Sequence, residues 1–208
     1  MRPLPALLLL AALGAPPAAA LLPPPDYRAE LDQKMAAELS ALNGGDAWEQ
    51  VVEKGEAYIE ALGPSAPVAY ELGFAENHLG HLSSALRWYG MAIEVDPNDP
   101  AARYDRGELL LASGKLDLAA ADFQVASELR PDHWAAWFRL SQVAGARGDA
   151  AAFEAHLIEA MRQGLDTRML VADPSWRAFS RDPALGPVLK RLITVYGDES
   201  ILPALQAP

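Results

Sequence analysis

The chain has 208 residues and a net charge of −11 at pH 7, which disfavours binding to nucleic acids, because their phosphate backbone is also negative. It contains no cysteine, which excludes disulfides, thiolate metal sites and a cysteine nucleophile. Apolar residues make up 51% of the chain, and alanine and leucine dominate them, which favours helices over sheets.

The N-terminal segment has the order of a secretory signal peptide. Arg2 supplies a positive charge, residues 7–13 form an apolar run, and residues 18–20 are alanines suited to cleavage. The run is too short to span a bilayer. We therefore expect a secreted or periplasmic protein, cut near Ala20, with a flexible linker over residues 21–26 and no membrane contact in the mature form. An uncleaved anchor or a disordered leader is the alternative.

Residues 27–64 are predicted to form a first, atypical helical pair. The first helix covers roughly residues 27–42 and ends at an Asn-Gly-Gly sequence, where glycine permits left-handed backbone geometry. Asp46 is then expected to cap a second helix that runs to about Leu62. Gly63 and Pro64 close this helix.

A 34-residue period follows over residues 66–165, in blocks that cover residues 66–99, 100–133 and 134–165. The first helix of each block is predicted to end at a glycine: Gly80, Gly114 and Gly148. Proline ends the second helix of the first two blocks, because the residue before proline avoids helical geometry. Asp99 is expected to cap the helix that begins at Pro100. Such a period indicates a solenoid, in which each unit buries its apolar face against its neighbours.

Two further Asp-Pro pairs, at Asp173 and Asp182, are predicted to start capping helices within residues 166–197. The second pair precedes an amphipathic helix that would cover the open end of the last repeat. Its apolar face comprises Leu185, Val188, Leu189, Leu192, Ile193 and Tyr196. Beyond Gly197 we expect a loose tail over residues 198–208.

The small, apolar and proline positions of the blocks resemble those of the tetratricopeptide repeat (TPR). The first block matches it at Leu72, Gly73, Ala85, Tyr89, Ala92 and Pro97. The second matches at Gly107, Ala119, Phe123, Ala126 and Pro131, and the third matches less well. The segment 173–192 also looks like the tail that closes bacterial arrays of this kind. The resemblance implies an all-α, right-handed α-solenoid of antiparallel helix pairs, without strands, and a C-terminal capping helix.

The resemblance also implies a concave groove lined by the first helix of each block. The corresponding residues are Tyr70, Phe74, Asn77, Tyr104, Glu108, Leu111, Phe138 and Gln142. One interpretation is an aromatic-lined groove for a peptide or a partner helix. The other is that the aromatic residues at the fifth position of each block pack sideways between neighbouring first helices. Repeat domains that clamp chaperone C-termini use lysine, arginine and asparagine at such positions, and this groove has none of the basic residues, so that role is not expected.

No sequence motif for catalysis, metal binding or a nucleotide cofactor appears. His78 and His81 are expected to be exposed turn residues, and Glu53, Glu56 and Glu60 a solvated helix face. We therefore predict a non-enzymatic scaffold without a cofactor, which binds a protein or peptide, and a basic or neutral partner fits its charge best. The alternative is a structural or assembly factor of the cell envelope that acts through self-association. A hydrolase in an atypical frame is the weakest option.

Three charges occupy positions that are normally packed in such repeats: Glu76, Arg103 and Arg106. Burial of an unpaired charge is costly, so each should find a partner or extend to water. We predict an ion pair, within about 4 Å, between Glu76 and one of the two arginines. Such a pair would hold the register between the first two blocks.

Overall fold

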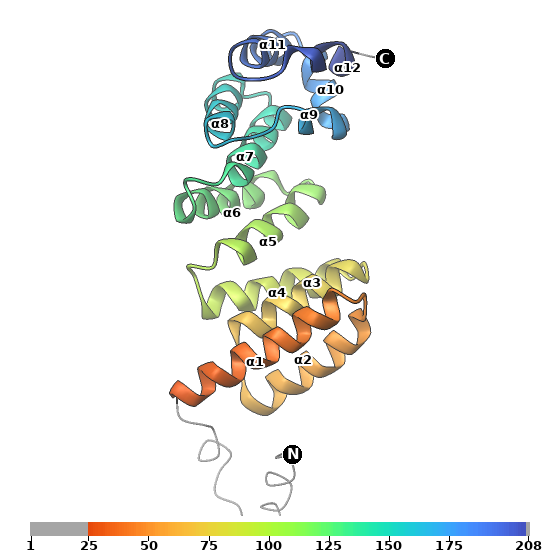
Figure 1. The fold of residues 1–208 in the computed structure, drawn as a ribbon, viewed down its shortest axis with the longest axis vertical. Helices are drawn as coiled ribbons and strands as arrows, with labels where there is room; N and C mark the ends of the chain where they lie inside the picture. The colour runs from red at the N-terminus through yellow and green to blue at the C-terminus, as the bar shows by residue number, and fades with distance from the viewer. Residues whose placement is uncertain (1–24, 207–208) are drawn as a thin grey trace, which may run out of the picture.

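The computed structural model describes residues 25–206, and the side chains from residue 27 onward. In this range the chain forms twelve α-helices and one 3-10 turn, and no strand. The helices stack along one long axis (Figure 1). The expected signal peptide and most of the expected linker lie outside the described residues, but residues 25 and 26 already belong to the first helix. A membrane-spanning helix is not found in the part of the chain that the structure describes.

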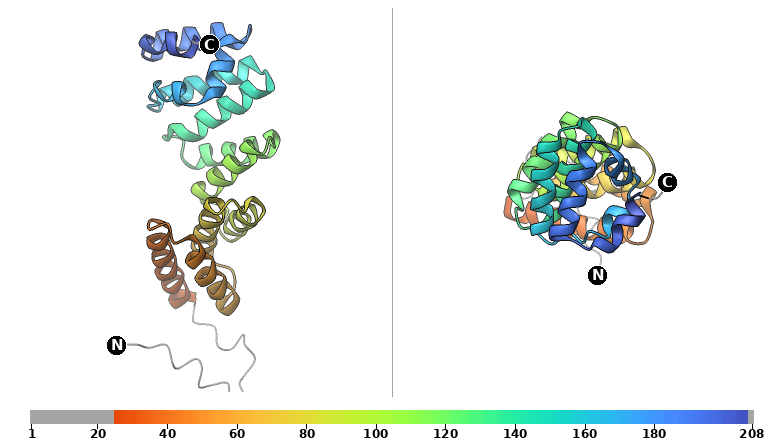
Figure 2. Two further views of the ribbon diagram at one scale, coloured as in Figure 1. Left: turned by 90° about the vertical axis from the view of Figure 1, so that its right-hand side faces the viewer. Right: turned by 90° about the horizontal axis from the view of Figure 1, so that it is seen from above.

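The first eight helices form four hairpins, in which each helix packs on the next. Seen end-on, the hairpins follow one another around the long axis (Figure 2). Their bounds are α1 (Pro25–Asn43), α2 (Trp48–Leu62), α3 (Ala66–His78), α4 (Leu82–Val95), α5 (Pro100–Ala112), α6 (Leu116–Leu129), α7 (Trp134–Arg147) and α8 (Ala150–Arg162). The C-terminal elements are α9 (Met169–Ala172), α10 (Pro174–Arg181), α11 (Leu185–Tyr196), η3 (Glu199–Ile201) and α12 (Leu202–Gln206).

The helix ends follow the predicted residues closely in the repeats. Asp99 accepts hydrogen bonds from the backbone N–H of Ala101 at 2.8 Å and of Ala102 at 3.3 Å, and so caps α5. Each first helix is followed by a glycine with positive φ, at 79° for Gly80, 71° for Gly114 and 72° for Gly148. These angles are strained for any residue with a Cβ, which explains the glycine at each position.

The turn between α1 and α2 differs from the prediction. The positive φ, 57°, belongs to Asp46, and neither Gly44 nor Gly45 has one. The residue before α2 is Ala47, and it makes no side-chain cap. Asp46 therefore does not cap α2, because it already supplies the left-handed residue of the turn, a role that aspartate tolerates better than most side chains.

Glycines let the two helices of a hairpin approach each other closely. A Cβ on Gly73 would lie 2.7 Å from the ring of Tyr89, and a Cβ on Gly107 would lie 2.7 Å from the ring of Phe123. Both rings are buried in the hairpin core. The expected layer of small residues facing large ones is therefore present in the first two blocks.

The three unusual charges are all paired, but not as predicted. Glu76 is buried and its Oε2 lies 2.7 Å from Nδ1 of His81, in the turn after α3. Arg106 makes two bonds to Asp122, at 2.7 and 2.8 Å, and Arg103 lies 3.6 Å from the same carboxylate. The predicted pair between repeats is wrong, because Asp122 faces both arginines from the second helix of their own hairpin.

Residues 199–206 form η3 and α12 and pack against the core, which corrects the expectation of a loose tail for this part of the segment. Ile201 and Leu205 are buried in the same core as Phe153 and Trp176. The hydroxyl of Ser180 donates to the backbone carbonyl of Leu205 at 2.7 Å. Helix α12 thus packs on α10 and on η3, while α11 packs on α8 and α10.

Candidate interaction groove

The eight predicted groove residues fall on three consecutive first helices, α3, α5 and α7. Most of them are half-buried, and Asn77 is exposed. Two of them, Phe138 and Gln142, retain only 5% exposure each. The structure therefore supports an open surface along α3 and α5, but not along α7.

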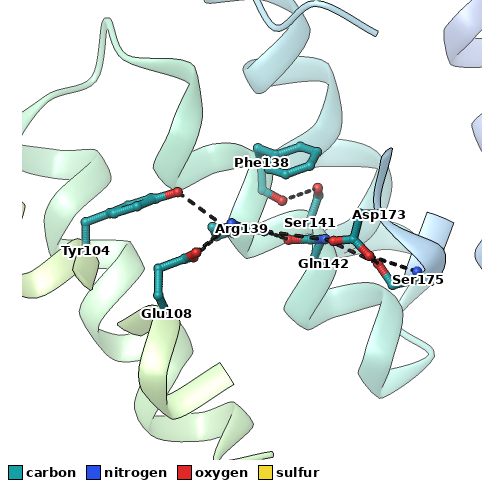
Figure 3. Close-up of polar contacts among 8 residues, drawn as sticks. All are labelled: Tyr104, Glu108, Phe138, Arg139, Ser141, Gln142, Asp173 and Ser175. Atoms are coloured by element: carbon teal, nitrogen blue, oxygen red, sulfur yellow. Dashed lines mark hydrogen bonds and ion pairs between the residues drawn. The ribbon is translucent and has the colours of Figure 1, made fainter. Parts of the chain in front are cut away.

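Helix α10 covers the predicted groove residues of α7. The ring of Phe138 stacks on Trp176, with centroids 5.1 Å apart. The side-chain amide of Gln142 donates to Asp173 Oδ2 at 2.5 Å and to Ser175 Oγ at 3.2 Å (Figure 3). The expectation that these two residues face a partner is thus wrong, because α10 takes the place of the next first helix.

The aromatic residues of α3 and α5 reach sideways to the next first helix. The hydroxyl of Tyr70 donates to Asp105 Oδ2 at 2.7 Å. The hydroxyl of Tyr104 accepts from Arg139 Nε at 3.3 Å (Figure 3). Both bonds join residues 35 positions apart, so each links one repeat to its successor. The hydroxyls of Tyr70 and Tyr104 therefore contact the neighbouring first helix, as in the second interpretation. Their rings remain half-buried at the surface.

Arg139, which the sequence did not single out, links α7 to α5. Its guanidinium donates to Glu108 Oε2 at 2.5 Å and to Gln142 Oε1 at 2.7 Å (Figure 3). Burial works against the charged form, but Glu108 and Tyr104 outweigh it and raise the pKa of Arg139. Sequence comparison of the blocks could have found it, because the aligned positions hold Glu71 and Asp105.

Three cavities share Tyr70 of α3 as a lining residue. The first, of about 210 Å3, lies among the N-terminal ends of α5 and α7. The second, of about 390 Å3, lies between α1 and α3 and reaches Ala101 of α5. The third, of about 430 Å3, lies at the turn between α1 and α2. We call the surface that carries these three cavities the Tyr70 groove.

Two carboxylates in the Tyr70 groove are held by neutral partners. Glu71 Oε2 accepts a hydrogen bond from Asn43 Nδ2 at 2.7 Å, and Asp105 accepts from Tyr70. Neither forms an ion pair with another described residue. Burial raises the pKa of both Glu71 and Asp105, although the hydrogen bonds from Asn43 and from Tyr70 oppose the shift. The Tyr70 groove therefore holds two carboxyl groups without a cationic partner among the described residues, while Arg130 lines its first cavity.

Aromatic rings line the cavity at the turn between α1 and α2. The ring of Trp48 stacks on His78 at 4.2 Å between centroids, and Phe74 lies 4.5 Å from His78 and 6.0 Å from Trp48. The turn positions Trp48 here, because Asn43 also donates to the backbone carbonyl of Glu71 at 3.2 Å and so fixes the turn to α3. Phe74 is the predicted groove residue of this cavity, and Trp48 was missed.

The remaining predicted groove residues and histidines play other parts. Leu111 packs against the core formed by the third and fourth hairpins. His78 and His81 are exposed, as expected. His156 is half-buried, and burial lowers its pKa. Among the described residues no group of three histidine or acidic side chains could hold a metal ion.

Comparisons with known proteins indicate the class of fold. No protein-family model matches the chain. A stretch of 91 residues is 33% identical to the tetratricopeptide repeat and J domain-containing co-chaperone DNJ1 of Cryptococcus neoformans var. grubii serotype A (strain H99). This stretch is 42% of the present chain but only 17% of that protein.

Several solved structures are similar in fold. One is MamA, with a TM-score of 0.60 and 15% identity over 64% of this chain and 77% of that one. Another is YrrB, described as a TPR protein with an unusual peptide-binding site, with a TM-score of 0.54 and 22% identity over 65% and 72%. The chain has an all-α fold, with its helices packed pairwise as in TPR solenoids.

Proposed function

We propose that the protein is an exported TPR scaffold that binds a segment of a protein partner in the Tyr70 groove. The observation that carries this proposal is the meeting of three cavities at one residue, Tyr70, on the surface of the first helices. Grooves of this kind take an extended peptide or a helix, because a continuous line of pockets can receive successive side chains. The protein acts by binding and not by catalysis.

The groove can be blocked without disturbing the core. Ala101 is exposed at the start of α5 and lines two of the three cavities. Ala101→Tyr would fill the groove, whereas Ala121→Tyr places the same ring on the exposed side of α6, away from the cavities. We expect the first variant to lose proteins that the wild-type chain captures from its native compartment, and the second to retain them. Equal capture by both variants at equal melting temperature would overturn the proposal.

Export is supported by the sequence of the N-terminal segment, with its charge, apolar run and small residues. N-terminal sequencing of the protein from its native compartment tests it. A mature chain that begins near residue 21 supports export, and an intact Met1 in the cytosolic fraction contradicts it.

Self-association at the C-terminal end is the second candidate. Val195 and Tyr196 at the end of α11 are 64% and 46% exposed. Large apolar side chains of this kind at the end of a stack favour contact with another chain. Light scattering after size exclusion should then show a dimer that Val195→Ser dissociates. A wild-type chain that stays monomeric removes this candidate.

A further inference from the structure

We propose that the cavity at the turn between α1 and α2 receives the lysine or arginine side chain of a partner segment. This inference rests on the proposed function, since the segment itself would lie in the Tyr70 groove. We call the cavity the Trp48 pocket. Its lining residues include Trp48, Tyr70, Phe74, Glu71, Asn43 and Asp46.

The walls of the Trp48 pocket suit a cation. Trp48, Tyr70 and Phe74 are half-buried and line the cavity together with His78, which stacks on one face of Trp48. The face of an aromatic ring carries negative charge density and attracts ammonium and guanidinium groups. The same apolar rings can also cover the methylene stem of a long basic side chain.

The Glu71 carboxylate of the pocket also has no cationic partner among the described residues. Glu71 is half-buried and accepts a hydrogen bond only from neutral groups among the described residues. Keeping a carboxylate in such a place is costly unless a positive charge accompanies it. A cationic side chain of a partner would supply that charge, and Asp46 on the same cavity adds to the attraction.

Asn43 gives a second, independent indication. The residue is only 4% exposed, and its Oδ1 is buried without a hydrogen-bond donor among the described residues. Its Nδ2 is occupied by Glu71, which fixes the orientation of the amide with the oxygen as the free group. Buried acceptors without a donor are rare in proteins. Asn43 lines the Trp48 pocket, so a basic side chain bound there would lie beside a residue whose acceptor is unfilled.

An anionic segment is disfavoured at the same place. It would meet Glu71 and Asp46 in the pocket itself, in a chain whose net charge is −11, and Arg130 lies only in the first cavity, away from the pocket. A neutral segment could fill the cavity but would leave Glu71 without a counter-charge. The chemistry of the pocket therefore selects a basic side chain over both.

The test uses the full chain and four pools of short fluorescein-labelled peptides. The central residue is fixed as lysine, arginine, norleucine or glutamate, and the flanking positions are randomised over uncharged residues. We expect a cationic pool to bind at least about tenfold more tightly than the norleucine pool, which corresponds to roughly 1.4 kcal/mol. The preference should weaken as salt screens the charges.

Two variants locate the preference in the pocket. Glu71→Gln removes the charge and Phe74→Leu removes one ring face while keeping apolar bulk, so each should reduce the preference for the cationic pools over the norleucine pool. Glu53→Gln removes one charge from the exposed side of α2, outside the three cavities, and should change nothing. Melting curves confirm that each variant is folded.

The outcomes separate this inference from the proposed function. Equal binding of the norleucine and cationic pools, blocked by Ala101→Tyr, overturns the cationic pocket while the groove stands. A cationic preference that survives both Glu71→Gln and Phe74→Leu also overturns it. If no pool binds the wild-type chain, the pocket assignment fails, and the capture experiment with Ala101→Tyr then decides on the groove alone.

Discussion

Tyr70 and Asp105 join two successive repeats through one hydrogen bond of 2.7 Å. The same step of 35 residues leads from Tyr104 to Arg139, where the tyrosine accepts instead of donating. From Phe138 it leads to Asp173, but phenylalanine has no hydroxyl, and the neighbouring Gln142 bonds Asp173 instead. The same pair of repeat positions is thus in contact in each step, but the side chains that form the bond differ. These bonds hold the register between repeats, a role that the sequence analysis had predicted for Glu76.

Asp105→Asn should make the protein more stable at neutral pH. Burial raises the pKa of Asp105 in the folded chain, so the ionised carboxylate costs stability once the pH exceeds that value. The cost disappears below the unfolded pKa of about 3.9. Asparagine can still accept the bond from Tyr70. Denaturant unfolding should therefore show a gain at pH 7 that vanishes at about pH 3.5.

Asp132→Asn provides the control for this measurement, because Asp132 is exposed in the turn before α7. It should leave stability unchanged at both pH values. A loss of stability in Asp105→Asn at pH 7 would mean that its charge holds the groove together, contrary to the burial argument.

Gly107→Ala and Gly90→Ala should change stability in opposite directions. A Cβ on Gly107 would lie 2.7 Å from the ring of Phe123, so the substitution overpacks the hairpin and should cost about 1–3 kcal/mol. A Cβ on Gly90, in α4, would meet only Arg106 Nη1 at 3.8 Å. Alanine there should stabilise the helix by up to about 1 kcal/mol. Equal effects in urea unfolding would contradict the close approach at Gly107.

The repeat positions were predictable because they depend on local sequence. Glycine stops, the Asp99 cap and the small residues against Tyr89 and Phe123 follow from backbone geometry and from a fixed period. The tail was not predictable in this way. Ile201 and Leu205 have no periodic partner in sequence, and their burial depends on where α10 leaves apolar surface open.

The candidate site was predictable only in part, for a related reason. The groove positions on α3 and α5 follow from the repeat, so Tyr70 and Phe74 were found. Trp48 enters the pocket through an irregular turn whose left-handed residue, Asp46, is not a glycine. Phe138 occupies a groove position of the repeat, but Trp176 of α10 covers its ring, because no further repeat follows α8.

Phe138→Ala should act on stability and not on binding. The ring is 5% exposed and packs against Trp176 and Trp134, so truncation should cost about 3–5 kcal/mol. Tyr104→Phe removes only the bond from Arg139 and should cost about 0.5–1.5 kcal/mol. Melting curves and partner capture on both variants check this. A stable Phe138→Ala variant with weakened capture would show that α7 does contribute to partner binding.

The ion pair of Arg139 and Glu108 should show strong coupling in a double-mutant cycle. Both side chains are largely buried, at 23% and 30% exposure, and their partners lie on α5, α7 and the segment before α10. Arg139→Gln leaves Glu108 without a cation and leaves Tyr104 without a donor, so it should destabilise the chain clearly. Glu108→Gln leaves Arg139 with Gln142 and, 4.0 Å away, Asp173, and should cost less.

The double variant replaces the ion pair by two amides and should be more stable than Arg139→Gln alone, because removal of an unpaired buried charge outweighs the loss of the pair. Urea unfolding of the four proteins measures the cycle. Additive effects would show that the two side chains act separately, and that the bond between α5 and α7 contributes little to the register of the stack.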